Sequence, residues 1–560
     1  MPGRAEGGAV PQRMSLIPRT TFPAKPLAGA IALAFLALLA GGALFSLAFE
    51  ASRDESGAFA AFDAYLWRVA RFTLLQALLS TLLSVGLALP VARALHAHQH
   101  FIGRAFILRL FALPLALPAL VAVLGITSIY GRAGFIAKTA HYFDFGFTPD
   151  IYGLTGILLA HVFFNLPLAV RLLLAGLDSI PPDYWKLSAQ LGMGSGSRFR
   201  LIEWPAIARS LPGIMGLVFM LCVTSFTIVL TLGGGPRATT LEVAIYQALH
   251  YDFDIGRAVA LTLTQLALTL AILFLFRLTG RPTEEGFSLA ITTRRYEKLR
   301  PGERLIDLSV ILLAFLFVAL PIAGMVISGL VADFGRLFSE RSVWRAIATS
   351  LILGGAAALL SVILSLALVA AREAVASGRK MGRKQSFFER GLDTGASLIL
   401  VVPPIIIGAG WFILLRHFAD PFDFAPWMVI SVNAAMAMPF AVRLLRPTWD
   451  TESARHNRLC AQLGISGWTR LRLVDWPVLR RPLSVAFAFA MALSLGDLGT
   501  IALFGSDAVQ TLPYLLLQRM GSYRTLDAAG LALILGVLSL GLMMLADRGS
   551  QASPRKEERP

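Results

Sequence analysis

Twelve long apolar runs limit what this chain can fold into. A helix that crosses a hydrocarbon core of about 30 Å needs about 20 mainly apolar residues, and helices are the open-chain structure that satisfies backbone polar groups in lipid. The runs do not alternate as the strands of a transmembrane barrel do. They predict an all-α polytopic membrane protein with about twelve spans, at residues 27–49, 72–95, 106–130, 151–177, 211–232, 256–278, 305–331, 346–371, 392–415, 425–446, 483–504 and 526–546.

The composition agrees with this class and excludes a soluble one. Of the 560 residues, 56 % are hydrophobic and 15 % are charged, whereas soluble domains average about 45–50 % apolar and about 25 % charged residues. Cys222 lies in an apolar run and Cys460 in a basic segment, so we expect two free thiols. No set of cysteines and histidines has metal-ligand spacing, and no metal site is predicted.

The lysines and arginines orient the spans. With the N-terminus placed inside the cell, the inside segments hold 35 of these residues and the outside loops hold 11. Cytoplasmic loops of membrane proteins carry such an excess of positive charge. We therefore expect both termini in the cytoplasm. The net charge of +16 then indicates basic cytoplasmic loops rather than a nucleic-acid partner.

The two halves of the chain share a repeat at an offset of 272 residues. Residues 165–209 and 437–481 are identical at 18 of 45 aligned positions. Each copy follows the fourth span of its half, so the repeat is parallel rather than inverted. We expect a first half at 1–278 with a cytoplasmic loop at 178–209, a linker at 279–304, and a second half at 305–560 with a cytoplasmic loop at 450–481.

The duplicated cytoplasmic loop predicts a docking surface. Each copy has a short helical stretch, Pro182–Leu191 or Glu452–Leu463. A glycine follows, Gly192 or Gly464, which can end a helix in the left-handed conformation. One such loop would be interpreted as a basic segment on anionic lipid. Two copies in matched register indicate instead that a cytoplasmic partner binds two similar surfaces.

These residues resemble the cytoplasmic loop of binding-protein-dependent ABC importer permeases. The family pattern is EAA, three residues, a glycine, nine residues and I-x-L-P. Nine residues separate Gly192 from Ile202-Glu-Trp-Pro205, and nine separate Gly464 from Val474-Asp-Trp-Pro477. The EAA positions read Lys-Leu-Ser and Arg-Leu-Cys, so both copies depart from the pattern in the same way. The resemblance implies that two coupling helices dock onto an ATPase through Lys186, Ala189, Gly192, Pro205, Arg458, Ala461, Gly464 and Pro477.

A narrower resemblance covers most of the chain and is strongest near its end. The fused permeases of bacterial thiamine and thiamine pyrophosphate importers are similar to it in three runs, Ser494-Leu-Gly-Asp-Leu-Gly499, Phe504-Gly-Ser-Asp-Ala-Val-Gln-Thr-Leu-Pro-Tyr-Leu-Leu516 and Gly521-Ser-Tyr-Arg-Thr-Leu-Asp-Ala-Ala529. Fused ferric-iron permeases share the two-half plan and a similar glycine turn. The run from Phe504 to Ala529 favours thiamine.

This resemblance implies an inner-membrane permease without an active site of its own. ATP and magnesium would bind to a partner ATPase present in two copies, and a periplasmic thiamine-binding protein would deliver the substrate. The chain has no G-x-x-x-x-G-K-[ST] phosphate loop. An ion-coupled secondary transporter with two parallel six-span halves is the alternative from another class, but such a carrier has no ATPase to dock.

A few polar residues within the predicted spans are candidates for a translocation path. Intramembrane polar groups usually face the bundle or a water-filled path, although for Asn and Ser we favour hydrogen bonding between helices. Asp497 either attracts a cationic substrate or caps the turn that follows it. The candidates are Asn165, Ser225, Asn433, Ser494 and Asp497.

Three alternating histidines, His96, His98 and His100, lie in a predicted cytoplasmic connection. Metal binding uses such residues, but we expect a solvated loop at the membrane interface.

Overall fold

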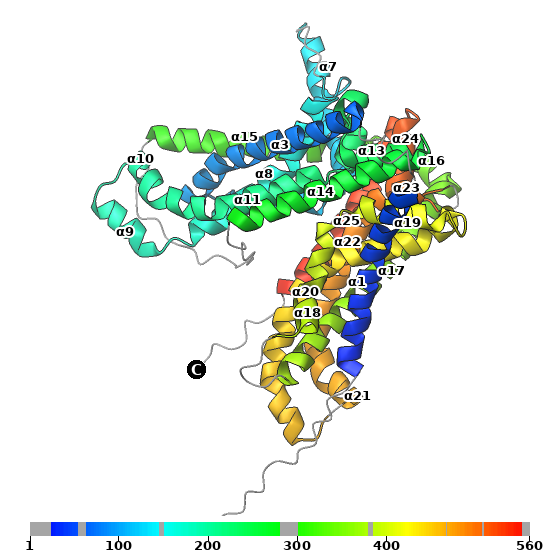
Figure 1. Ribbon diagram of the computed structural model, residues 1–560. Coiled ribbons are helices and arrows are strands. Elements are labelled where there is room, and N and C mark those ends of the chain that lie inside the picture. The colour runs from blue at the N-terminus through cyan, green and yellow to red at the C-terminus, as the bar shows by residue number, and fades with distance from the viewer. Residues whose placement is uncertain are drawn as a thin grey trace, which may run out of the picture.

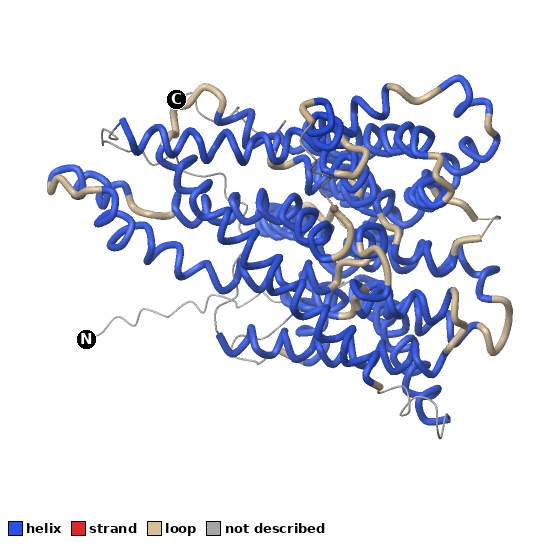
Figure 2. Tube along the Cα trace, turned by 90° about the horizontal axis from the view of Figure 1, so that it is seen from above, coloured by secondary structure: helices blue, strands red, loops and turns tan. Residues whose placement is uncertain are grey.

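The computed structural model describes residues 24–53, 63–144, 150–279, 301–378, 385–465, 467–506 and 509–551. Within these ranges the chain forms helices and loops and no strand (Figure 2). Eleven helices are long and apolar enough to cross a membrane, or 12 if one bent pair forms a single span. The all-helical class and the predicted number of spans are therefore confirmed. Most of the linker 279–304 lies outside the described residues.

The long helices follow the same order in both halves of the chain. The first half has α1 (Ala24–Arg53), α3 (Ala64–Ala97), α6 (Ala119–Tyr130) with α7 (Phe135–Tyr142), α8 (Leu154–Asp178), α11 (Trp204–Val223) and α14 (Ile255–Thr279). The second half has α15 (Pro301–Leu330), α17 (Arg341–Gly378), the pair α18 (Phe387–Leu398) and α19 (Pro404–Leu415), α20 (Ala425–Gln462), α22 (Trp476–Gly496) and α25 (Thr525–Gln551).

Shorter elements connect them. They are α4 (Arg104–Leu110), α5 (Leu113–Ala116), α9 (Pro182–Gln190), α10 (Ser195–Arg198), η1 (Phe199–Glu203), α12 (Thr227–Leu232), η2 (Pro236–Ala238), α13 (Leu241–His250), α16 (Phe334–Ser339), η3 (Ile399–Val401), η4 (Pro421–Phe424), α21 (Gly467–Arg470), η5 (Leu471–Asp475), α23 (Gly499–Phe504) and α24 (Leu512–Gly521).

The repeat extends to these short elements. α10, η1 and α12 recur as α21, η5 and α23 at the offset of 272 residues. Gly192 and Gly464 have φ angles of 60° and 65°, which is the left-handed conformation predicted for the ends of the two helical stretches. The sequence repeat is therefore also a structural repeat.

The helices form two lobes that meet at one end and diverge at the other (Figure 1). One lobe contains α3, α8, α11 and α14, and the other contains α17, α20, α22 and α25. The short helices α13, α19, α23 and α24 lie where the lobes meet, and we call this region the junction. α9 and α10 lie at the far end of the first lobe and α21 at the far end of the second.

The first helix of each half packs in the lobe of the other half. α1 lies along α17 and α19, and α15 lies along α6 and α3 (Figure 1). Ion pairs hold the beginnings of both helices. Nζ of Lys25 in α1 is 3.8 Å from a carboxylate oxygen of Glu373 in α17. In the first lobe, Nη2 of Arg198 in α10 is 3.7 Å from Glu303 in α15. Both lobes are thus built from both halves of the chain.

The third span is interrupted in each half, so the continuous spans predicted at 106–130 and 392–415 are wrong. Leu117 and Val402 have ψ angles of 135° and 110° and end the short elements before α6 and α19. Each residue stands directly before a proline. A proline disfavours the helical conformation of the residue before it. In the second half the two helices are bent by 85°.

The fifth span begins and ends earlier than the runs 211–232 and 483–504 predict. α11 and α22 begin at the tryptophan of a Trp-Pro pair. A proline in the first turn of a helix costs no hydrogen bond, because the first N–H groups have no partner in the helix. Each helix then breaks before a short helix, α12 or α23. The breaks contain Ser225 and Asp497. Serine and aspartate side chains can bond to nearby backbone groups in place of the helical hydrogen bonds.

The second predicted coupling stretch is not a separate helix. α20 runs from the fourth span through Glu452 to Gln462 as one helix. In the first half, Pro181 and Pro182 separate α8 from α9. The repeat has no proline at the corresponding positions of the second half, so the helix continues there.

Candidate functional site

The predicted docking surface is formed by α9 and by the last turns of α20. Trp185 of α9 is fully buried, and its ring centroid lies 5.3 Å from that of His96 in α3. Ser188, one turn further along α9, is also buried. Its counterpart in α20 is Cys460, which is buried and a free thiol, as is Cys222. One side of each stretch is therefore anchored, and the other side is presented to solvent.

The exposed side carries a pair of leucines in each copy. Leu187 and Leu191 expose 52 % and 67 % of their surface, and Leu459 and Leu463 expose 51 % and 63 %. The two pairs occupy the same positions of the repeat. Exposed apolar residues grouped in this way are typical of an interaction site. The sequence prediction did not include these leucines. The presence of leucine at the same positions of both copies could have indicated them.

The residues predicted from the motif lie on this surface or beside it. Lys186 is exposed and pairs with Asp183 at 3.1 Å. Ala189 is half-buried, and Gly192, Gly464, Pro205 and Pro477 are exposed. Arg458 and Ala461 belong to α20, but their side chains lie outside the described part of the chain. Their role in coupling stays a prediction.

The solvated loop expected for the histidines is wrong for two of them. His96 is fully buried, with its Nε2 atom 3.4 Å from a carboxylate oxygen of Asp178. Nε2 of His98 is 3.3 Å from Asp307 of α15. These two contacts connect the C-terminal end of α3 to α8 and to α15, the first helix of the second half, which packs in this lobe. Of the three, only His100 is exposed.

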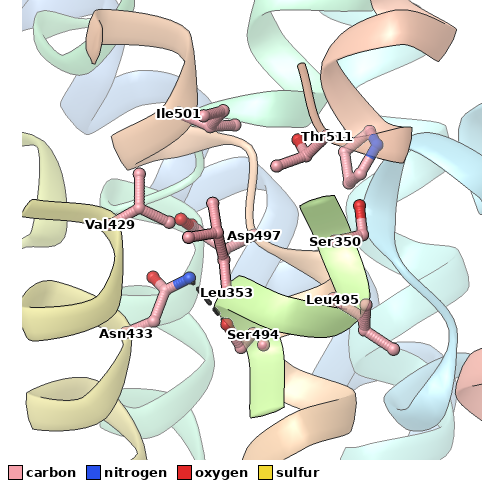
Figure 3. A pocket seen from close by; sticks show the side chains of 11 residues that line it. Ser350, Leu353, Val429, Asn433, Ser494, Leu495, Asp497, Ile501 and Thr511 are labelled. Atoms are coloured by element: carbon pink, nitrogen blue, oxygen red, sulfur yellow. Dashed lines mark hydrogen bonds between the residues drawn. The ribbon is translucent and has the colours of Figure 1, made fainter. Parts of the chain in front are cut away.

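A small polar pocket lies at the break between α22 and α23. Its lining includes Ser350, Asn433, Ser494, Asp497 and Thr511, and it has room for about one water molecule. Figure 3 shows these side chains around one space, with Asn433 and Ser494 joined on one side. Three of the five residues predicted for a translocation path are thus brought together here.

The contacts of Asp497 are those of a helix cap, one of the two roles predicted for it. One carboxylate oxygen accepts from the backbone N–H of Gly499 at 3.2 Å, and the other from that of Thr500 at 3.4 Å. These are the first residues of α23. Beside the carboxylate, Nδ2 of Asn433 donates to Oγ of Ser494 at 2.9 Å.

The two other predicted residues lie in the first half. Asn165 donates from Nδ2 to the sulfur of Cys222 at 3.3 Å, which is the helix-to-helix bonding favoured for it. Cys222 occupies the repeat position of Ser494, and the half-buried Ser225 that of Asp497. The structure therefore brings three of the five candidates together in the second half and leaves Asn165 and Ser225 in the first half.

Known proteins resemble this chain along most of its length. The thiamine transport system permease protein ThiP of Brucella abortus (strain 2308) is 71 % identical over 533 residues, which is 95 % of this chain and 96 % of that protein. The protein of the same name from Escherichia coli (strain K12) is 41 % identical over 96 % of this chain and 98 % of its own length. The ferric transport system permease protein FbpB of Actinobacillus pleuropneumoniae is 28 % identical over 30 % of this chain and 24 % of its own.

A family match covers both halves. Residues 70–283 and 374–556 each match the family described as the binding-protein-dependent transport system inner membrane component. Each match includes one copy of the duplicated cytoplasmic loop and the break in the fifth span. With these matches and its membrane-spanning helices, the protein is a multi-pass transport permease of the inner membrane. The chain belongs to the family of binding-protein-dependent transport system inner membrane components.

Proposed function

We propose that this chain is the permease of an ATP-binding-cassette importer that moves thiamine or thiamine pyrophosphate across the bacterial inner membrane. The observation that carries the proposal is the 71 % identity to a thiamine transport system permease over 95 % of the chain. A ferric-iron importer is the less favoured candidate, because that similarity extends over 30 % of the chain at 28 % identity.

In this proposal, two copies of a cytoplasmic ATPase dock onto α9 and onto the end of α20. The matching leucine pairs support it, because two identical partners need two similar surfaces. Trp185 lies directly beneath the α9 surface and against His96 of α3, so a displacement of α9 would be passed to a spanning helix. ATP and magnesium bind to the ATPase, and this chain supplies the path and no catalytic group.

The divergence of the two lobes supports a rocking mechanism. α9 and α21 lie at the separated ends of the lobes (Figure 1). If ATP brings the two ATPases together, these ends approach each other and the junction opens on the opposite side. The described arrangement then corresponds to the state that is open toward the ATPases.

Both termini lie in the cytoplasm in this proposal. α1 begins at the same end of its lobe as α21 (Figure 1), and the loops at that end carry most of the positive charge. The opposite end, with α13, α24 and α7, then faces the periplasm.

A periplasmic thiamine-binding protein would dock at that outer end. Two aromatic residues, Phe253 after α13 and Tyr523 after α24, are exposed there to 74 % and 92 %. Both have positive φ angles, 51° and 58°, which are uncommon for residues other than glycine. A pair of protruding aromatic residues, one from each half, fits a partner with two lobes.

The experiment is transport by the reconstituted system. The permease is placed in vesicles with its ATPase, the binding protein is added outside and ATP inside, and uptake of labelled thiamine is measured. We expect uptake that needs all three proteins and ATP. Uptake driven by an ion gradient without ATP would favour the secondary transporter. Uptake of ferric iron without uptake of thiamine would favour the other importer.

A further inference from the structure

The first half has a group of buried polar side chains at the place that corresponds to the polar pocket. The first residue of α13 and the first residue of α24 are held by equivalent hydrogen bonds. Each donates its backbone N–H to a hydroxyl group on the second span of its half. The backbone N–H of Leu241 donates to Oγ1 of Thr73 in α3 at 3.0 Å. The N–H of Leu512 donates to Oγ of Ser350 in α17 at 2.7 Å. Since Ser350 lines the pocket of the second half, Thr73 marks the equivalent place in the first.

The equivalent place is surrounded by polar side chains. His161 of α8 occupies the repeat position of Asn433, and its Nδ1 atom lies 2.8 Å from Oγ of Ser80 in α3. Gln76 of α3 donates from Nε2 to the carbonyl oxygen of Cys222 at 2.9 Å. Together with Thr73, these bonds join α3, α8, α11 and α13 around one buried region.

Four buried polar atoms in α3, α8 and the start of α13 have no hydrogen-bond partner in the described part of the chain. They are Oε1 of Gln76, Nε2 of His161, Oγ1 of Thr240 and Oε1 of Glu242. All four side chains are buried, with at most 2 % of their surface exposed. A buried polar group without a partner is costly and calls for a ligand, a water or an ion that satisfies it.

The matching starts of α13 and α24 place Glu242 and Thr240 beside this region. Counted from the first residues of α13 and α24, they correspond to Pro513 and Thr511, and both of those residues line the pocket of the second half. Glu242 forms no ion pair among the described residues. A buried carboxylate is normally paired.

The two halves therefore each supply one carboxyl group near the junction, from different elements. In the second half it is Asp497, which caps α23. In the first half Ser225 takes that position, and the carboxyl group belongs to Glu242 at the start of α13. α13 contacts α23 across the junction. An acidic group is thus retained on both sides although its place in the sequence differs.

We propose that Glu242, with Gln76, His161 and Thr240, forms a first-half binding site for a cationic heteroaromatic substrate. The inference rests on the proposed function, because it names residues that bind the substrate proposed there. The carboxylate of Glu242 pairs with the positive charge on the substrate's ring. The unpartnered polar atoms of Gln76, His161 and Thr240 form hydrogen bonds with polar groups at the edge of that ring. Separation of the two halves at the junction would open the site.

The test measures equilibrium binding to the permease–ATPase complex in detergent, in the presence of a non-hydrolysable ATP analogue that, in the proposed rocking mechanism, holds the junction open. The two probes are thiamine and a neutral isostere in which carbon replaces the quaternary ring nitrogen. We expect Glu242→Gln to weaken thiamine binding about tenfold or more, because one partner of a buried charge pair is lost, and to leave binding of the isostere nearly unchanged. Glu242→Asp keeps the charge and should retain more affinity for thiamine than Glu242→Gln.

The matched control is Glu50→Gln in α1, a carboxylate that pairs with His417 at 3.5 Å. It should bind both probes as the wild type does. Equal losses for the two probes in Glu242→Gln, or no loss for either, would overturn the inference. Vesicle uptake by the wild type is measured alongside. If the wild type takes up no thiamine, the proposed function falls and this inference with it, whereas normal uptake together with an unaffected Glu242→Gln removes the inference alone.

Discussion

Gly410 of α19 lies directly against Ala43 of α1, so that a Cβ atom at position 410 would stand 2.5 Å from the Ala43 carbonyl oxygen. Gly125, its counterpart in α6, lies in the same way against the Pro321 backbone of α15. Both contacts join an exchanged first helix to the lobe of the other half. Small residues allow helix backbones to approach closely in membranes, so the exchange depends on glycine at these positions.

Gly410→Ala should therefore destabilise the permease. A methyl group at this position collides with backbone rather than with a flexible side chain, and such overpacking typically costs about 1–3 kcal/mol. Thermal unfolding in detergent, followed by the loss of monodisperse protein, should show a lower midpoint. Gly41→Ala in α1 is the control, because a Cβ there meets no atom within 4 Å. Equal midpoints for the two variants would contradict the close packing described for Gly410.

The orientation of the spans can be tested with single cysteines. Ser197→Cys at the α10 end and Ala419→Cys before η4 are both at exposed positions. In intact cells an impermeant thiol reagent should label position 419 and spare position 197. The native Cys222 and Cys460 are buried, so the background should be low. Labelling of position 197 would reverse the proposed topology.

The glycines that end the coupling stretches should be intolerant of β-branched residues. Gly192 and Gly464 have positive φ angles, which a valine side chain opposes. We expect Gly192→Val and Gly464→Val to abolish transport and weaken co-purification of the ATPase, while the permease still inserts. Gly194→Val is the control, because its φ of −70° suits any residue. Normal ATP-dependent uptake by the double variant would refute the docking assignment.

The span count and the repeat could be predicted from the sequence, because hydrophobic length and local identity determine them. The interruption at Val402 was missed because counting apolar residues gives no weight to the proline that follows. The packing of α1 and α15 in the lobe of the other half could not be predicted, for a different reason. The contact between Gly410 and Ala43 joins residues far apart in the chain, and hydropathy does not specify which apolar helix packs on which.

The candidate site was predicted in part for similar reasons. Gly192 and Gly464 belong to a local motif, so their positions and conformation were accessible from the sequence. The local sequence predicts a solvated loop for His96, because the burial of His96 depends on Trp185, which belongs to another helix. Glu242 was missed because it lies outside the apolar runs and has no acidic counterpart in the repeat.

Phe253 and Tyr523, the exposed aromatic residues at the outer end, should be needed for stimulation of the ATPase by the binding protein and not for its basal rate. Phe253→Ser with Tyr523→Ser removes two exposed side chains that protrude after α13 and α24. We expect the basal ATPase rate of the reconstituted complex to stay the same and its stimulation by the binding protein to fall several-fold. Phe143→Ser is a control for exposed aromatic residues elsewhere at this end. Full stimulation in the double variant would assign the two residues to the lipid interface instead.

Asp497 can be tested for its two roles separately. Its carboxylate caps α23 through Gly499 and Thr500, and it also lines the pocket with Asn433 and Ser494. Asp497→Asn keeps an acceptor for the cap and removes the charge, whereas Asp497→Leu removes both. A lost cap costs about 0.5–2 kcal/mol, so only Asp497→Leu should lower the unfolding midpoint. If the charge attracts a cationic substrate, Asp497→Asn should insert and fold normally and take up thiamine poorly. Wild-type uptake by Asp497→Asn, with loss in Asp497→Leu alone, would leave capping as the role of this residue.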